Sequence, residues 1–194
     1  MAIVLAPLVA PATIEEQRAR LPPPATCDDP VEGVWRSHQY NARFGDWGVF
    51  TLTVRRSAPG ANTLVGTIHS HSWSGGPAQS EPPRCSPGIR HWTVQMSAAG
   101  TWDPSRRAIE FWGTRWWIES IQCERWATYN LDHFSGLIDP AIQEFQSVNN
   151  DGGRSVNEPR VFRRIQCLGD LSAPHPSVAP PPFRPPSRSG CARR

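Results

Sequence analysis

The histidines are the side chains whose spacing comes closest to a reactive centre. His69 and His71 alternate along a stretch that predicts a strand, so their side chains point to the same face. Two histidines at this spacing, joined by a third from a neighbouring strand, could bind zinc, copper or iron. The other face carries Leu64, Gly66 and Ile68, which are better suited to a core. We therefore interpret His69 and His71 as surface histidines, with a metal-dependent enzyme as an alternative.

A second pattern with metal-binding spacing is the polar segment 147–158. Laid over a twelve-residue calcium loop, it places Asp151 at position 5, Gly152 at the required glycine and Glu158 at position 12. Ser147 stands at position 1, where the calcium-binding pattern has Asp. Asp151 and Glu158 are thus weak candidates for metal ligands, like the two histidines. We favour a polar hairpin loop and expect no cofactor.

Tryptophan is unusually frequent, with nine residues in the chain, and each brings a large apolar surface to bury or to use. Simple alternation along 108–123 places Trp112 and Trp116 on one face and Phe111 and Trp117 on the other. One face can fill a core, while an exposed aromatic row on the other is typical of a platform for a sugar or an apolar ligand. The alternative is that packing and loops cover both faces. The candidate ligand-binding residues are Trp35, Trp92, Trp112 and Trp116.

Other sequence motifs that carry enzyme chemistry are absent. The chain contains no phosphate-binding Gly-x-x-x-x-Gly-Lys, no His-Glu-x-x-His and no Gly-x-Ser-x-Gly. Nor do the carboxylates offer a catalytic pair: Asp132 and His133 are adjacent along a predicted strand and point to opposite faces, and so do Glu110 and Glu119, nine residues apart on another. The sequence therefore favours a non-enzymatic protein.

Five cysteines subdivide the chain, and none forms a Cys-x-x-Cys pair. Cys27 and Cys167 stand just outside the first and last expected strands, which are neighbours in a closed meander. Cys85 falls in the loop before the fourth expected strand and Cys123 at the end of the fifth, and these two strands are adjacent and antiparallel. We predict the disulfides Cys27–Cys167 and Cys85–Cys123, with Cys191 unpaired, although four cysteines allow three connectivities. Disulfides imply an extracytoplasmic protein, secreted or periplasmic; five reduced thiols in the cytosol are the alternative.

The elements that position these residues are expected to be strands. Alternating apolar and polar residues predict strands at 34–40, 49–56, 63–73, 89–98, 108–123, 129–139, 144–148 and 160–166. We predict an all-β domain over 32–167, built as a single antiparallel meander of about eight strands that closes into a barrel; a two-sheet sandwich is the alternative. Residues 1–31 are expected to form an apolar and Pro-rich signal remnant and linker, and residues 168–194 a disordered Pro- and Arg-rich tail.

The tripeptide Gly33-Val34-Trp35 opens the first expected strand and is similar to the Gly-x-Trp that opens lipocalin-type barrels. The resemblance covers these three residues and the number of strands. It implies an eight-stranded cup whose closed end is plugged by Trp35, and it implies no particular ligand. The family's other short motifs are not found in the chain.

Charge and hydropathy argue against two classes of partner. Residues 172–194 carry four of the twenty Arg and no acid, which leaves 16 Arg against 17 acidic residues elsewhere. A near-neutral body argues against nucleic-acid binding. No apolar run reaches the roughly 18 residues of a membrane span. The leading hypothesis is a non-enzymatic, extracytoplasmic barrel that binds a small apolar or carbohydrate ligand; a structural or interaction module of the cell envelope is the alternative.

Overall fold

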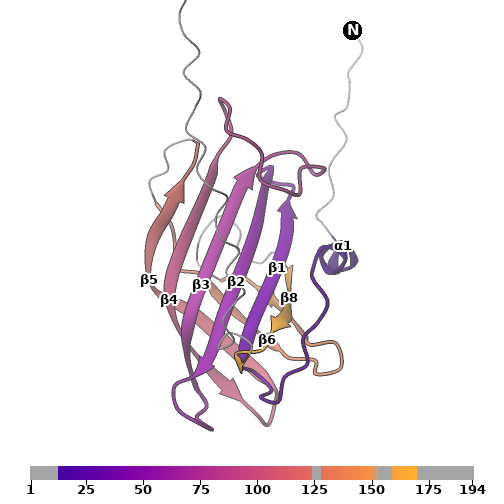
Figure 1. Cartoon of the computed structure of the whole chain (residues 1–194), viewed down its shortest axis with the longest axis vertical. Helices are drawn as coiled ribbons and strands as arrows, with labels where there is room; N and C mark the ends of the chain where they lie inside the picture. Colours follow the sequence, from indigo (N-terminus) through magenta and orange to yellow (C-terminus); the bar gives the residue numbers. More distant parts are fainter. Residues whose placement is uncertain (1–12, 124–127, 151, 153–158, 170–194) are drawn as a thin grey trace, which may run out of the picture.

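A computed structural model describes residues 13–123, 128–150, 152 and 159–169 of the chain. The expected signal remnant, Asp151, Glu158 and most of the tail with Cys191 lie outside these residues. The elements of the described part are α1 (Ile14–Ala19), β1 (Gly33–Asn41), β2 (Asp46–Arg56), β3 (Thr63–Ser74), β4 (His91–Asp103), β5 (Ala108–Ile121), β6 (His133–Leu137), β7 (Glu144–Val148) and β8 (Pro159–Gln166) (Figure 1). The predicted all-β fold of eight strands is confirmed. Within the described part, no helix has the length and apolar character needed to cross a membrane.

The strands form one antiparallel sheet in the order β6-β5-β4-β3-β2-β1-β8-β7. The two outermost strands, β6 and β7, meet through side chains. Ser147 Oγ accepts a hydrogen bond from the backbone N–H of Ser135 at 2.9 Å, and Asn149 Oδ1 accepts one from the N–H of His133 at 3.1 Å. The sheet is therefore a nearly closed barrel rather than a two-sheet sandwich. Figure 1 shows β1 to β5 side by side, with α1 next to β1 and β8.

Two irregularities in the pairing of β4 with β5 decide which residues of β5 face the interior. The register shifts twice along this pair, and each shift inserts one extra residue into β5, the first of them Thr114. Directly paired residues share a face of the sheet. Trp116 pairs with the buried Met96 and faces inward, whereas Trp112 pairs with Ala99 and faces outward. The prediction that Trp112 and Trp116 share a face is therefore wrong.

An apolar cluster fills the barrel from the end where β1 begins, which we call the Trp35 end, and reaches Trp92 and Val94 towards the opposite end, the Trp92 end. The ring of Phe162 lies 4.8 Å from that of Phe134 and 4.9 Å from that of Phe145, measured between centroids. The side chains with almost no exposed surface in this cluster include Trp35, Leu52, Leu64, Ile68, Met96, Phe111, Phe134, Phe145 and Phe162. These residues alternate along their strands, as a filled barrel interior requires.

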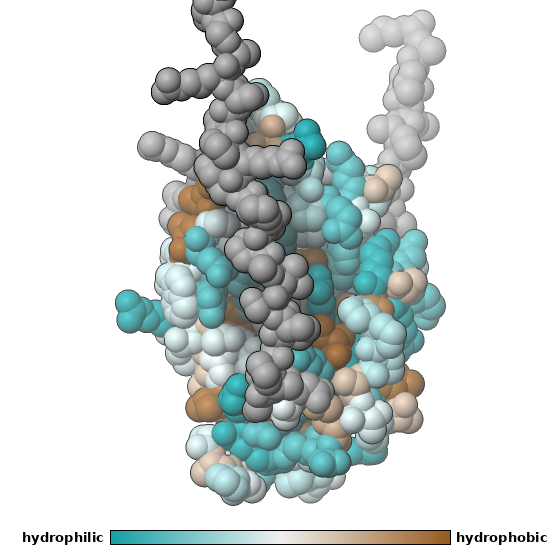
Figure 2. All heavy atoms as spheres, in the orientation of Figure 1, coloured by the Kyte–Doolittle hydropathy of each residue, from teal (hydrophilic) through white to brown (hydrophobic). Residues whose placement is uncertain are grey.

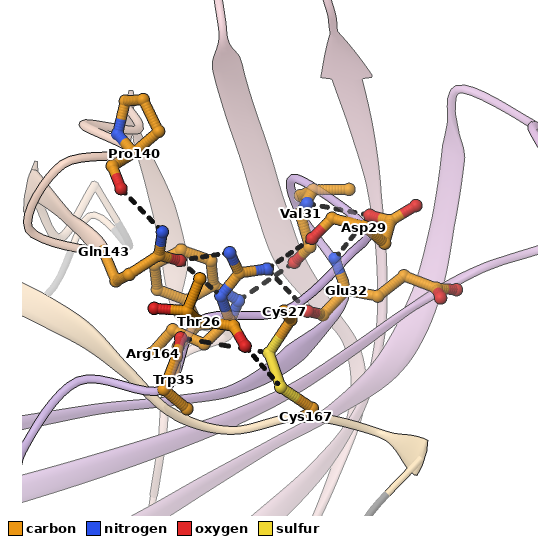
Figure 3. The surroundings of a disulfide bond; sticks show 11 residues. Thr26, Cys27, Asp29, Val31, Glu32, Trp35, Pro140, Gln143, Arg164 and Cys167 are labelled. Carbon is orange, nitrogen blue, oxygen red and sulfur yellow. Dashed lines mark hydrogen bonds between the residues drawn. A yellow bond between two sulfur atoms is a disulfide. The ribbon is translucent and has the colours of Figure 1, made fainter.

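A buried arginine seals the Trp35 end. Arg164 is 2% exposed, and its guanidinium lies 5.2 Å from the centre of the Trp35 ring. It donates to the carbonyl oxygens of Asp29 at 2.6 Å and Glu32 at 3.0 Å. It also donates to the Gln143 side chain (Figure 3). The segment before β1 is thereby tied to the end of the barrel.

The structure contains the two disulfides expected from the sequence. Cys27–Cys167 joins the segment before β1 to the residue after β8, at the Trp35 end (Figure 3). Cys85–Cys123 joins the loop between β3 and β4 to the chain just after β5. The predicted pairing is confirmed, and with it the neighbourhood of β1 with β8 and of β4 with β5.

A second, smaller apolar cluster lies on the outer face of the barrel. The loop 75–90 covers it, because Trp47 Nε1 donates to the Gly76 carbonyl at 2.9 Å and Trp73 Nε1 donates to the Gln79 carbonyl at 3.0 Å. The buried members of this outer cluster are Tyr40, Trp47, Val49 and Trp73. The loop that carries Cys85 is thus packed against the barrel wall.

Candidate functional site

At the Trp92 end, β4 and β5 give the interior an apolar wall. Val94 pairs with Ile118, and Trp92 pairs with Ile121. Val94 is fully buried, but Ile118 and Ile121 are 36% and 38% exposed although they lie on the inner side. Trp116 belongs to the same wall and is partly buried against the core. Apolar surface is therefore accessible on this wall, and Figure 2 shows a small apolar patch over the upper end of β5.

The opposite wall of the interior is polar. Ser37 and Gln39 of β1 face inward, where they pair with Phe50 and Gly48 of β2. Their side chains are buried, and among the described residues neither Ser37 Oγ nor Gln39 Oε1 has a hydrogen-bond partner. A buried polar atom without a partner costs about 1–3 kcal/mol. The fold thus keeps two hydrogen-bonding groups in its interior against its own stability, as binding sites often do.

A positive charge lies on the same polar wall. Arg160 of β8 is 5% exposed, and its guanidinium is 4.6 Å from the centre of the Phe50 ring. Gly48 lies beside it, and a Cβ at this position would be in ordinary contact with Arg160 Nη1 at 3.6 Å. Ser72 pairs with Gly48 from the next strand. We call Ser37, Gln39, Gly48 and Arg160 the polar wall, and Trp92, Val94, Trp116, Ile118 and Ile121 the apolar wall.

A hydrogen-bonded network holds Tyr129 and Asp132, just before β6. Asp132 is 1% exposed; its Oδ2 accepts from the Tyr129 hydroxyl at 2.8 Å and its Oδ1 accepts from Asn149 Nδ2 at 2.7 Å. The Tyr129 hydroxyl also lies 2.9 Å from Ser70 Oγ. Burial and the negative charge of Asp132 raise the pKa of Tyr129 well above its ordinary value. Tyr129 therefore stays neutral and acts as a fixed hydrogen-bonding group.

The structure separates the four candidate tryptophans. Trp92 and Trp116 lie on the apolar wall, Trp35 is in the core at the other end, and Trp112 is on the outside of β5.

The chain matches no family model, no curated protein and no solved structure. Evidence for its role therefore comes from the geometry of these walls and surfaces.

The candidate histidines lie on the outer face of β3, as expected. His69 Nε2 is 2.6 Å from Glu119 Oε2, and His71 Nε2 is 2.7 Å from His91 Nε2 of β4. The ring centroids of His71 and His91 are 4.9 Å apart and the ring planes differ by 23°, so the two nitrogens lie between the rings and face each other. This arrangement suits an N–H···N hydrogen bond. Among the described residues, no three His, Cys, Asp or Glu side chains are grouped as metal ligands would be.

The histidine pair predicts a loss of stability in mild acid. Burial, followed by the nearby charge of His91, lowers the pKa of His71 to about 4, from an ordinary value of 6.5. The unfolded chain therefore binds this proton more readily, and stability falls as the pH drops below 6.5 towards 4. Between pH 7 and pH 5 we expect His71 to account for a loss of up to about 2 kcal/mol.

Urea unfolding at a series of pH values measures this loss. His71→Gln should flatten the curve. Burial also lowers the pKa values of His38 and His91, so a smaller slope of the same sign should remain. A His71→Gln curve as steep as that of the parent protein would contradict this account.

The sequence prediction missed the polar wall. The alternation of side chains along β1 could have revealed this wall. Ser37 and Gln39 follow Trp35 by two and four residues and therefore share its inward face. Arg160 likewise alternates with the buried Phe162 of β8. Polar side chains at positions with core periodicity are the informative ones, because burial without a partner is costly.

Proposed function

We propose that the protein binds a small, mainly apolar molecule with one polar head group, inside the barrel at the Trp92 end. The apolar wall would hold the body of the ligand, and Ser37 and Gln39 would bind its head group. The observation that carries this proposal is the accessible apolar surface of Ile118 and Ile121 opposite two buried polar atoms that lack partners among the described residues. Small-molecule sites typically combine an apolar lining with a few placed polar groups.

The proposal also assigns the protein to an extracytoplasmic compartment and to the lipocalin-like binding barrels. Two disulfides are typical of proteins that mature in an oxidising environment. Trp35, two residues after Gly33, fills one end of an eight-stranded, nearly closed barrel, as the resemblance implies. A ligand would then enter from the opposite end.

The apolar wall can be tested with two adjacent tryptophans that face opposite ways. Trp116 faces the interior and Trp117 the outside, where it pairs with Gln95. Trp116→Ala should weaken binding of 1-decanol by about tenfold or more, because the contact of a large aromatic ring is worth at least about 1.5 kcal/mol. Trp117→Ala should bind as the parent protein does. Titration calorimetry measures both, and thermal unfolding shows whether each variant is folded; Trp116→Phe replaces Trp116→Ala if it is not.

The polar wall can be tested in the same assay by comparing 1-decanol with decane. The parent protein should prefer decanol, and the double variant Ser37→Ala with Gln39→Leu should lose that preference. Equal binding of both probes by the parent protein would overturn the assigned head-group site. No binding of either probe would overturn the proposal and favour a structural or interaction module of the cell envelope.

A further inference from the structure

An open cleft of about 410 Å³ lies on the outside of the barrel, between β5 and the chain that leads into β6. Trp112, Glu110 and His133 line it, together with Leu131 and Asp132. Trp112 and His133 pair directly across β5 and β6. Trp112 and His133 lie on the outer face, opposite to Trp116, so these two side chains are separate from the interior site of the proposed function, whereas Asp132 at the base is joined through Tyr129 to the interior.

The side chains of the cleft are held in place. His133 Nε2 lies 2.9 Å from Glu110 Oε1, and this bond links the two strands at the rim. The rings of Trp112 and His133 are 6.0 Å apart at an interplanar angle of 70°. The backbone N–H of Asn150 donates to the His133 carbonyl at 3.0 Å. These contacts fix the indole as one wall and the Glu110–His133 pair as the polar rim.

The base of the cleft is also rigid, because Asp132 is bound on both oxygens by Tyr129 and Asn149. Its carboxylate is therefore a source of negative charge rather than a mobile ligand. Leu131, 39% exposed, adds an apolar contact beside the indole. The cleft thus offers an aromatic wall, hydrogen-bonding groups at the rim and a negative charge below.

We propose that this cleft binds a pyranose sugar, either neutral or an amino sugar. A pyranose has an apolar face of C–H groups that packs on an indole ring, and hydroxyls around its edge that hydrogen-bond to groups such as Glu110 and His133. The volume suits a monosaccharide or disaccharide, since small-molecule sites measure about 300–1,000 Å³. Among the described residues, the lining includes two carboxylates and no arginine, so uronic acids are disfavoured by charge.

Saturation-transfer NMR tests the site with the methyl glycosides of glucose, galactose and mannose, with glucosamine and with glucuronic acid. We expect at least one methyl glycoside or glucosamine to bind, and glucuronic acid to bind more weakly than either class. Trp112→Ala should weaken sugar binding by about tenfold or more, and Trp112→Phe should retain part of it. Trp117→Ala, an outward tryptophan on the same strand but outside the cleft, is the matched control.

Three results would overturn the sugar site: no binding by any of the neutral or amino sugars, equal losses in Trp112→Ala and Trp117→Ala, or a preference for glucuronic acid. Titration of 1-decanol into Trp112→Ala separates this inference from the proposed function. Unchanged decanol binding with lost sugar binding supports two independent sites. Loss of both ligands in a folded Trp112→Ala protein would contradict their separation.

Discussion

Trp35→Ala and Arg164→Ala are each expected to lower the free energy of unfolding by about 3–5 kcal/mol. Trp35 is fully buried, so its removal leaves a large cavity at the end of the barrel. Arg164→Ala removes the donor to the carbonyls of Asp29 and Glu32 and to the side chain of Gln143. Each buried acceptor left without a donor costs about 1–3 kcal/mol.

The two effects should not add, because the guanidinium of Arg164 lies over the Trp35 ring. The double variant is expected to lose less than the sum by about 0.5–3 kcal/mol. Urea unfolding followed by circular dichroism measures the three variants. Arg164→Lys is the matched control: it keeps a positive charge but loses the planar fork that reaches three acceptors, so it should lose most of the same stability. Losses that add to within about 0.3 kcal/mol would show that Trp35 and Arg164 act separately.

The strands were predictable because apolar and polar residues alternate along most of them. Phe50, Leu52 and Val54 are buried on one face of β2, as their spacing of two indicates. The glycine at the start of β1 is explained by its contact with β8. Gly33 has a φ of +146°, and a Cβ there would lie 2.7 Å from Arg164 Cδ. The Gly-x-Trp pattern therefore reflects the close approach of β1 and β8 beside the buried arginine.

The candidate site was harder to predict because the faces of β5 depend on its partner strand. Each register shift reverses the alternation that follows it. Gly113 marks the first shift, since a glycine inside a strand is typical of a bend or bulge, but nothing in the sequence of β5 alone marks the second. Trp116 thus lies on the apolar wall, whereas strict alternation along β5 predicts that it shares a face with Trp112. The cleft around Trp112 is non-local as well, since His133 and Leu131 reach it from the chain that leads into β6.

Removing the Cys27–Cys167 disulfide is expected to destabilise the protein more than removing Cys85–Cys123. The two bridges close loops with sequence separations of 140 and 38 residues. In the chain-entropy model, such loops correspond to about 5 and about 4 kcal/mol of stability, respectively. The paired variants Cys27→Ala with Cys167→Ala and Cys85→Ala with Cys123→Ala leave no new free thiol, and urea unfolding compares them directly.

The local surroundings of the two bridges should widen this difference. Beside Cys27, the backbone N–H of Ala25 donates to the Arg164 carbonyl at 2.9 Å, so loss of this bridge also loosens the segment that seals the Trp35 end. Loss of Cys85–Cys123 frees the loop 75–90, which can leave the outer cluster while the barrel strands stay paired. Hydrogen exchange should then rise in 75–90 but not in β1 or β8. A larger loss of stability without Cys85–Cys123, or exchange that rises equally in all strands, would contradict this assignment of the two bridges.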